Sequence, residues 1–363
     1  MARFSYGGQA LIEGVLMRGR TAIAVALRHP DGRIVWADEK LAVGFRATRW
    51  ARLPFVRGLV VLYETLVVGT RWLVRSAGIA AVEELAPLQP APSALSAPSA
   101  LSAPNPAADP AGVQDAVDDG AMRPPAPAAP VANSADLGKG AVALMLGLTL
   151  VVGVGLFFFL PLLLAKAIAG GQSGVVERAV EGVIQIAIFL GYLLLIGRTS
   201  DVRRTFQYHG AEHMTIHALE AGDPLTVDAV RKYPTAHPRC GTEFLVVVIL
   251  VSIVVFSVVG RQAIPVMVAS RIVLIPVIAG ISYELLRFGA RHRDSRIVRW
   301  IFEPGIWVQK ITTKQPTDDM LEVAIVSLEQ ALLADGEALP DGAGRIGRSS
   351  LMISAKASPA AEA

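Results

Sequence analysis

Residues 141–165 read AVALMLGLTLVVGVGLFFFLPLLLA and contain no charged side chain. A helix needs about 20 apolar residues to cross the hydrocarbon core of a bilayer, so this run can span a membrane even with Pro161 near its end. Three further apolar runs follow at Gly182–Gly197, Phe244–Gly260 and Ile264–Leu286. Short connections separate the first run from the second and the third from the fourth. The pattern predicts about four spans arranged in two helical hairpins.

The composition supports the same class of protein. Hydrophobic residues make up 53% of the 363-residue chain and charged residues 18%, with a mean hydropathy of +0.48, which is too apolar for an ordinary soluble enzyme. The net charge is only +3, and basic residues flank the apolar runs, so we expect no nucleic-acid partner. We predict a mainly α-helical integral membrane bundle with a small N-terminal β-rich region and an interfacial or embedded helix.

Changes in composition divide the chain into eight segments. The clearest is an Ala/Pro/Ser-rich linker that holds 11 of the 23 prolines and is expected to be disordered. The segments are a β-rich cytoplasmic region (1–53), an interfacial or embedded helix (54–85), the linker (86–136), a first transmembrane hairpin (137–198), a cytoplasmic His/Cys loop (199–243), a second hairpin (244–286), a cytoplasmic helical region (287–335) and a disordered tail (336–363).

The helix at 54–85 carries a polar stripe. Its charged residues Arg57, Glu64, Arg71 and Arg75 are spaced by seven, seven and four positions, which places them on one helical face. Such a stripe suits a helix at the membrane interface, and a fully spanning helix is the alternative.

Arginines and lysines predict the orientation. They are frequent in the N-terminal region, between the two hairpins and after the last apolar run. Cytoplasmic loops of membrane proteins carry an excess of these residues, so we expect both termini and the His/Cys loop to face the cytoplasm, with the apolar runs in the membrane and lipids as partners.

A row of histidines lies between the hairpins. His209, His213 and His217 are spaced by four, so a helix would present them on one face, with Glu220 just beyond. The first five residues of this row also spell H-x-x-E-H, the order seen in inverted zinc peptidases. Glu212 is therefore the candidate catalytic base.

His237 and Cys240 follow about twenty residues later and complete the candidate ligand set. Imidazole and thiolate are zinc ligands, and Pro238 with Gly241 favours a turn that would present them together. We predict that His209, His213, His217, His237 and Cys240 bind Zn²⁺ or another divalent transition metal. Two other interpretations remain open: histidines placed among lipid headgroups beside a small buried cysteine, and a closed structural zinc site without catalysis.

Several blocks of sequence resemble the bacterial YqhQ-like family of uncharacterised multi-pass membrane proteins, some of which are labelled as metal-dependent enzymes. The blocks are GGQALIEGVLMRG, FQYHGAEHMTIHALE, HPRCGTEFL, RIVLIPVIAGISYE and PGIWVQKITTKQPTDDMLEVAI. The resemblance covers roughly residues 6–80 and 137–333 and implies the membrane architecture and a metal, without a substrate. Met214 stands where the family pattern has Lys.

These observations lead to one principal functional hypothesis and two alternatives. The principal one is a metal-dependent enzyme of the bacterial inner membrane, such as a hydrolase, that acts on an amphiphilic substrate at the cytoplasmic surface with Glu212 as base. The first alternative is a non-catalytic scaffold or assembly factor held together by structural zinc, and the second is a transporter. A protein partner or a homo-oligomer stays open.

Three other features carry expectations. Arg271 lies deep in the fourth apolar run, so it should pair with Glu181, or less favourably Glu177, unless it extends to the external headgroups. Gly7, Gly8 and Gly14 could let the backbone approach a ligand and Arg18 could contact a phosphate, although glycine turns in a small sheet explain the same residues and are favoured. The segment 305–310 is expected to act as an aromatic anchor at the membrane surface.

Overall fold

The computed structural model describes residues 6–41, 53–81, 139–170, 174–238, 240–259, 263–292, 295–347 and 349–350. The chain is mainly helical and has a small N-terminal sheet. The linker expected at 86–136 and positions 351–363 of the expected tail lie outside the described residues.

The sheet is an antiparallel meander with one short parallel addition. Its order is β1 (Gly7–Leu11), β2 (Gly14–Arg18), β3 (Ala22–Arg28), β4 (Ile34–Lys40) and β5 (Ser349–Ser350), which runs parallel to β4. The sequence predicted one strand across LIEGVLM, but the chain turns back at Ile12-Glu13, so that Leu11 pairs with Gly14. Glu13 in this turn has a φ of 54°, which is uncommon for a residue other than glycine. Its carboxylate accepts two hydrogen bonds from the guanidinium of Arg204, with N–O distances of 2.6 and 2.5 Å.

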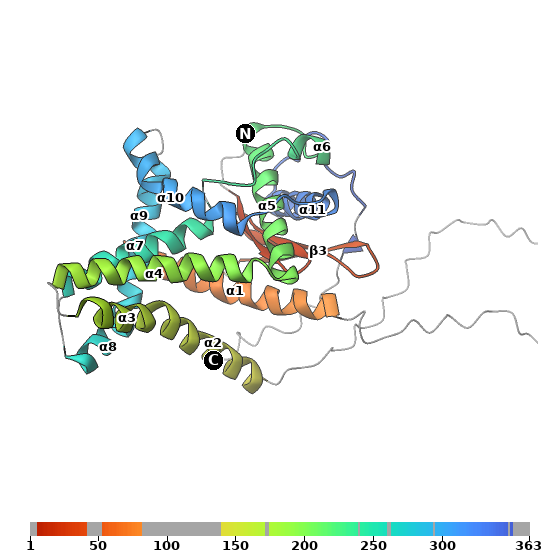
Figure 1. Cartoon of the computed structure of the whole chain (residues 1–363). Helices are drawn as coiled ribbons and strands as arrows, with labels where there is room; N and C mark the ends of the chain where they lie inside the picture. Colours follow the sequence, from red (N-terminus) through yellow and green to blue (C-terminus); the bar gives the residue numbers. More distant parts are fainter. Residues whose placement is uncertain are drawn as a thin grey trace, which may run out of the picture.

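Helices cover both faces of the sheet (Figure 1). α5 (Ser200–Ala221) and α11 (Asp318–Ala334) pack on the face that carries Val15 and Met17. α1 (Val56–Ala81) packs on the opposite face, where its buried Trp72 joins Leu16 and Val25. Side chains of successive strand residues point to opposite faces, and here both sets are apolar. The sheet is therefore buried between two layers of helices.

α11 is buried on all sides over most of its length, whereas Asp318, Asp319 and Leu333 at its ends are exposed. The sequence predicted an amphipathic helix, and its apolar stripe Leu321, Ile325, Leu328 and Leu332 is indeed buried, but so are polar residues elsewhere on the helix. Ser327 Oγ donates a hydrogen bond to the carbonyl oxygen of Val15 at 3.0 Å. Residues 336–347, the first part of the expected disordered tail, add apolar contacts to this core through Leu339 and Ile346.

Among the described residues, three helical segments are long and apolar enough to cross a membrane: Gly147–Ala169, Gly174–Ile196 and Gly241–Val259. The first joins α2 (Lys139–Val154), a π-helical turn (Gly155–Phe159) and α3 (Leu160–Ala169), and the other two are α4 and α7. Many of their large apolar side chains are exposed, among them Leu148, Leu163 and Val258. A protein in water would cover such a surface, whereas lipid solvates it.

The fourth apolar run differs from the single helix that the sequence predicted. It forms α8 (Ile264–Val273) and α9 (Ile275–Arg291), which are separated at Leu274. Pro276 explains the break, because proline has no N–H to donate and its ring clashes with the preceding turn.

The polar stripe of α1 faces the protein. Glu64 pairs with Arg18 of β2 at 3.0 Å, Arg71 pairs with Glu39 of β4 at 2.6 Å, and Arg57 Nε lies 2.7 Å from Glu284 of α9. Apolar residues of the same helix are left exposed, including Tyr63, Leu66, Val67 and Val74. The polar side of α1 therefore packs against the sheet and α9, and its apolar side lies on the outside of the described structure.

α10 (Arg296–Thr312) leads from α9 back to the sheet, and α6 (Val227–Val230) is a single turn beside α5 and α11. α10 exposes Trp300 and Trp307 on one side. Its last turn reaches the histidine row of α5.

Candidate metal centre

The histidine row lies on α5, as the spacing predicted. At Gly210, α5 lies very close to the chain that follows α10. A Cβ on Gly210 would be 2.2 Å from the carbonyl oxygen of Lys314, so only glycine fits there. The N–H of Lys314 donates to the carbonyl oxygen of Phe206 at 2.9 Å. This contact places the backbone of residues 312–314 beside the histidines.

His209, His213 and Cys240 form the first ligand group. One ligand atom from each lies within 4.8 Å of the others. His209 Nδ1 is 2.9 Å from the carbonyl oxygen of Thr312, and His213 Nδ1 is 2.6 Å from that of Thr235. A carbonyl oxygen can only accept, so both Nδ1 atoms must donate, which leaves the lone pair of each Nε2 available. Metal-ligating histidines are oriented in this way.

Cys240 closes this group from the turn before α7. Its Sγ lies 3.2 Å from His209 Nε2 and 3.3 Å from the N–H of Thr242, and the side chain is buried. Burial, together with the nearby Glu212 carboxylate, raises the pKa of the thiol to about 12. A divalent cation reverses such an effect by favouring the thiolate. Burial also holds the pKa of His213 well below its usual value, which keeps this imidazole neutral and able to bind a metal.

His217, Glu220 and His237 form a second ligand group, whose ligand atoms also lie within 4.8 Å of one another. The sequence predicted a single ligand set that joins His237 to Cys240 and the histidines of α5. The structure instead places His237 Nε2 3.4 Å from Glu220 Oε2 and its ring 4.5 Å, centre to centre, from that of His217. Glu220 was not among the candidate ligands, although its position three residues after His217 puts it on the same helical face.

The two groups are neighbours. The ring centres of His213 and His237 are 5.7 Å apart, so the five predicted ligands do lie together, as two adjacent sets. Gln309 of α10 holds the second set in place, since its Oε1 accepts a 2.8 Å hydrogen bond from the N–H of His237. Gln309 is fully buried, whereas Trp307 is exposed, so only part of the segment 305–310 can act as the anchor that the sequence suggested.

Glu212 is buried between α5 and β1. The N–H of Gly8 donates to its carboxylate, and Oε2 lies 4.0 Å from His213 Nε2. Burial raises the pKa of this carboxyl group, while His209 opposes the increase. A Cβ on Gly8 would be 3.1 Å from Glu212 Cγ and 2.4 Å from the carbonyl oxygen of Leu16, so glycine is required for this contact.

A cavity of about 220 Å³ opens onto the first ligand group and Glu212. The cavity is also lined by Gly7, Gly8 and Gln9 of β1, Arg18 of β2 and Thr65 of α1. From the sequence, a purely structural role is favoured for the glycines and Arg18. No local pattern indicates that strands and histidines nearly 200 residues apart share one cavity, so sequence reasoning missed this part of its lining.

Arg271 and Glu181 also meet. Arg271 Nη2 lies 2.6 Å from Glu181 Oε1, and both side chains are buried. The guanidinium also stands 3.8 Å from the centre of the Phe256 ring, a cation–π contact. This pair joins α8 to α4 and is separate from the two ligand groups.

These features define a mainly helical protein with membrane-capable helices and a buried His/Cys cluster beside a small sheet. The chain belongs to the DUF1385 family, described as a protein of unknown function, whose model matches residues 53–334. It is 28% identical over 336 residues to the uncharacterized protein YqhQ of Bacillus subtilis (strain 168), a match that covers 90% of this chain and 92% of that protein. No solved structure matches the chain.

Proposed function

We propose that the protein is a metal-dependent membrane enzyme, a hydrolase, with His209, His213 and Cys240 as ligands of Zn²⁺ or another divalent transition metal. One observation carries the proposal: three convergent ligands, two of them oriented by backbone carbonyls, border a cavity that also holds a carboxylate. Catalytic zinc sites have three protein ligands and one open position.

The residues fit this chemistry. The chemistry supplied by such a metal is Lewis acidity at a carbonyl or phosphoryl oxygen. Glu212 lines the cavity beside His213 and is placed to accept a proton from an attacking water. Gly8 holds the carboxylate in that position through its N–H. Gln9 and Arg18 also line the cavity, and Arg18, which Glu64 holds at 3.0 Å, places a guanidinium group beside the substrate position.

An amphiphilic substrate agrees with the position of the cavity. Gly241, the first residue of the membrane-capable helix α7, lines it, and so does α1, whose outer side is apolar. A substrate headgroup in the cavity would therefore lie close to lipid. α1 contacts lipid through its exposed apolar side in this proposal, and α8 with α9 completes the second hairpin.

The hydrolase proposal predicts that Glu212→Gln lowers the rate by about 10²- to 10⁴-fold, the usual contribution of a general base, and leaves the bound metal unchanged. The assay uses purified protein with p-nitrophenyl esters of short and long acyl chains and with bis-p-nitrophenyl phosphate, and metal content is measured on the same samples. Glu303→Gln, an exposed acid on α10, is the matched control. Equal rates for the wild type and Glu212→Gln, with metal bound to both, would instead favour a structural zinc site in a scaffold.

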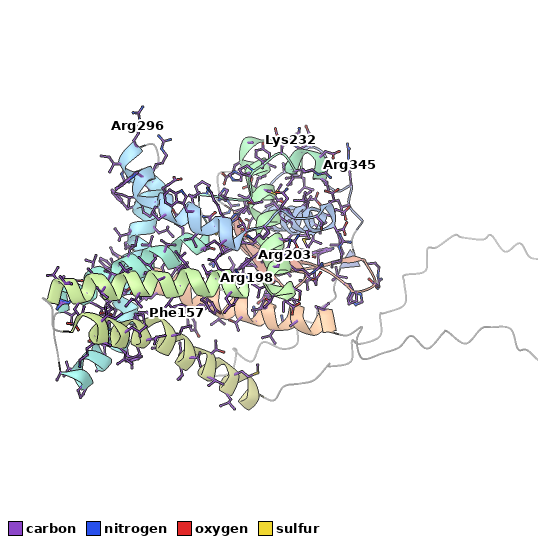
Figure 2. The ribbon with its side chains drawn as sticks, viewed as in Figure 1. Phe157, Arg198, Arg203, Lys232, Arg296 and Arg345 are labelled. Atoms are coloured by element: carbon purple, nitrogen blue, oxygen red, sulfur yellow. The ribbon has the colours of Figure 1, made fainter. Side chains whose placement is uncertain are left out.

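The proposal also includes an orientation, with the sheet and both termini in the cytoplasm and the hairpins in a bacterial inner membrane. Figure 2 shows Arg198, Arg203 and Lys232 at the end of the molecule that holds the sheet, whereas Phe157 lies among the apolar helices. The positive-inside rule places such residues in the cytoplasm.

Labelling of single cysteines in intact cells tests this orientation. Lys232→Cys, at an exposed position beside α6, should react with a membrane-impermeant maleimide only after the cells are permeabilised. Gln172→Cys, between α3 and α4 in the sequence, should react in intact cells. The wild type gives the background from the buried Cys240. Labelling of Lys232→Cys in intact cells would contradict the orientation.

A further inference from the structure

The second ligand group has the composition of a metal site in its own right. It supplies two imidazoles and one carboxylate, and its ligand atoms lie as close together as those of the first group. His217 Nε2 is 2.9 Å from the carbonyl oxygen of Ala236. That oxygen can only accept, so Nε2 donates and the lone pair of Nδ1 is available to a cation.

His237 belongs to the second ligand group and also lines the cavity that borders the first group. Its side chain is only 3% exposed. Its backbone is fixed by Gln309, so the imidazole is held between Glu220 and the ring of His213. Glu220 lies nearer the surface, with a third of its side chain exposed, which gives ions a route to this position.

We propose that His217, Glu220 and His237 bind a second divalent metal ion beside the first, so that the cluster is a two-metal centre. The proposal deepens the proposed function and rests on the first ligand group binding a metal. The two positions differ in chemistry: the first offers a thiolate, which suits zinc, whereas the second offers nitrogen and oxygen ligands, which also suit harder ions such as Mn²⁺ or Fe²⁺. Bound there, the second ion would supply further Lewis acidity beside the first ligand group, as in hydrolytic sites whose two metal ions lie about 3.5–4 Å apart.

Metal titration of the purified full-length protein tests this inference, with Co²⁺ and Zn²⁺ as the probes. The wild type should bind two equivalents of Co²⁺, one of which gives a sulfur-to-cobalt charge-transfer band from Cys240. Glu220→Gln should bind one equivalent with that band intact, because losing a direct ligand should weaken the second position at least as much as the roughly 10- to 100-fold cost of losing an outer-shell partner. His292→Ala and Glu303→Gln, both at exposed positions, should behave as the wild type.

The outcomes separate the two proposals. One equivalent in the wild type, with the charge-transfer band present and unaffected by Glu220→Gln, would overturn the second site and leave the proposed function standing; the His237–Glu220 contact would then be an ordinary ion pair. One equivalent without the band, removed by Glu220→Gln, would overturn the first site and keep a metal at the second. Size-exclusion profiles identify any variant that fails to fold.

Discussion

Replacing His209, His213 or Cys240 with alanine should remove the metal of the first group and lower the thermal stability of the protein. Each residue supplies one of three ligands, and the apparent free energy of zinc binding at structural sites is about 10–16 kcal/mol, so the loss of one ligand is costly. We expect the zinc content of that position to fall more than about tenfold. Metal analysis of the purified protein and thermal unfolding with and without a chelator measure both effects.

Histidines elsewhere in the chain provide the controls for that result. His29 lies in the turn between β3 and β4, and His292 follows α9, so alanine at either position should leave the metal content unchanged. Full zinc occupancy in a double variant, His213→Ala with Cys240→Ala, would show that the first group does not bind the metal.

Arg271→Leu and Glu181→Leu should each sharply reduce the folded yield of the protein in membranes. Each substitution leaves a buried charge without its partner, and breaking a buried ion pair costs about 3–5 kcal/mol. The double variant removes both charges and should recover part of the loss. Size-exclusion chromatography of a fluorescent fusion measures the yield.

Lys166→Leu, which removes an exposed cation from α3, is the matched control and should have little effect. Strictly additive losses in the double variant would mean that the two side chains do not interact, as expected if Arg271 extended to the headgroups instead.

The membrane-capable helices and the alignment of the three histidines on one helical face could be predicted from the sequence, because both depend on local helix geometry. Hydrocarbon thickness sets the length of a spanning helix, and the period of the helix brings His209, His213 and His217 to one face. The ion pair between Arg271 and Glu181 could also be predicted, because the two residues lie at similar distances from the external ends of their apolar runs.

Other features depend on contacts between distant segments, which a single sequence does not encode locally. Gln309 positions His237 from 72 residues away and so divides the ligands into two groups. The wall formed by β1 and β2 reaches the histidines only through the packing of α5 on the sheet. Both faces of α11 are buried because the sheet, α5 and residues 336–347 surround it.

The burial of the sheet between early and late segments has a consequence for synthesis in the cell. About 280 residues separate the end of β4 from the start of α11, which covers one face of the sheet. At about 5–20 residues per second, the ribosome needs roughly 15 to 60 seconds to produce that helix after the strands have emerged. During this interval the strands expose apolar side chains and unpaired edges while the apolar helices are already being made. The nascent chain therefore depends on chaperones, or on early docking of α1, to protect the sheet until its last helix arrives.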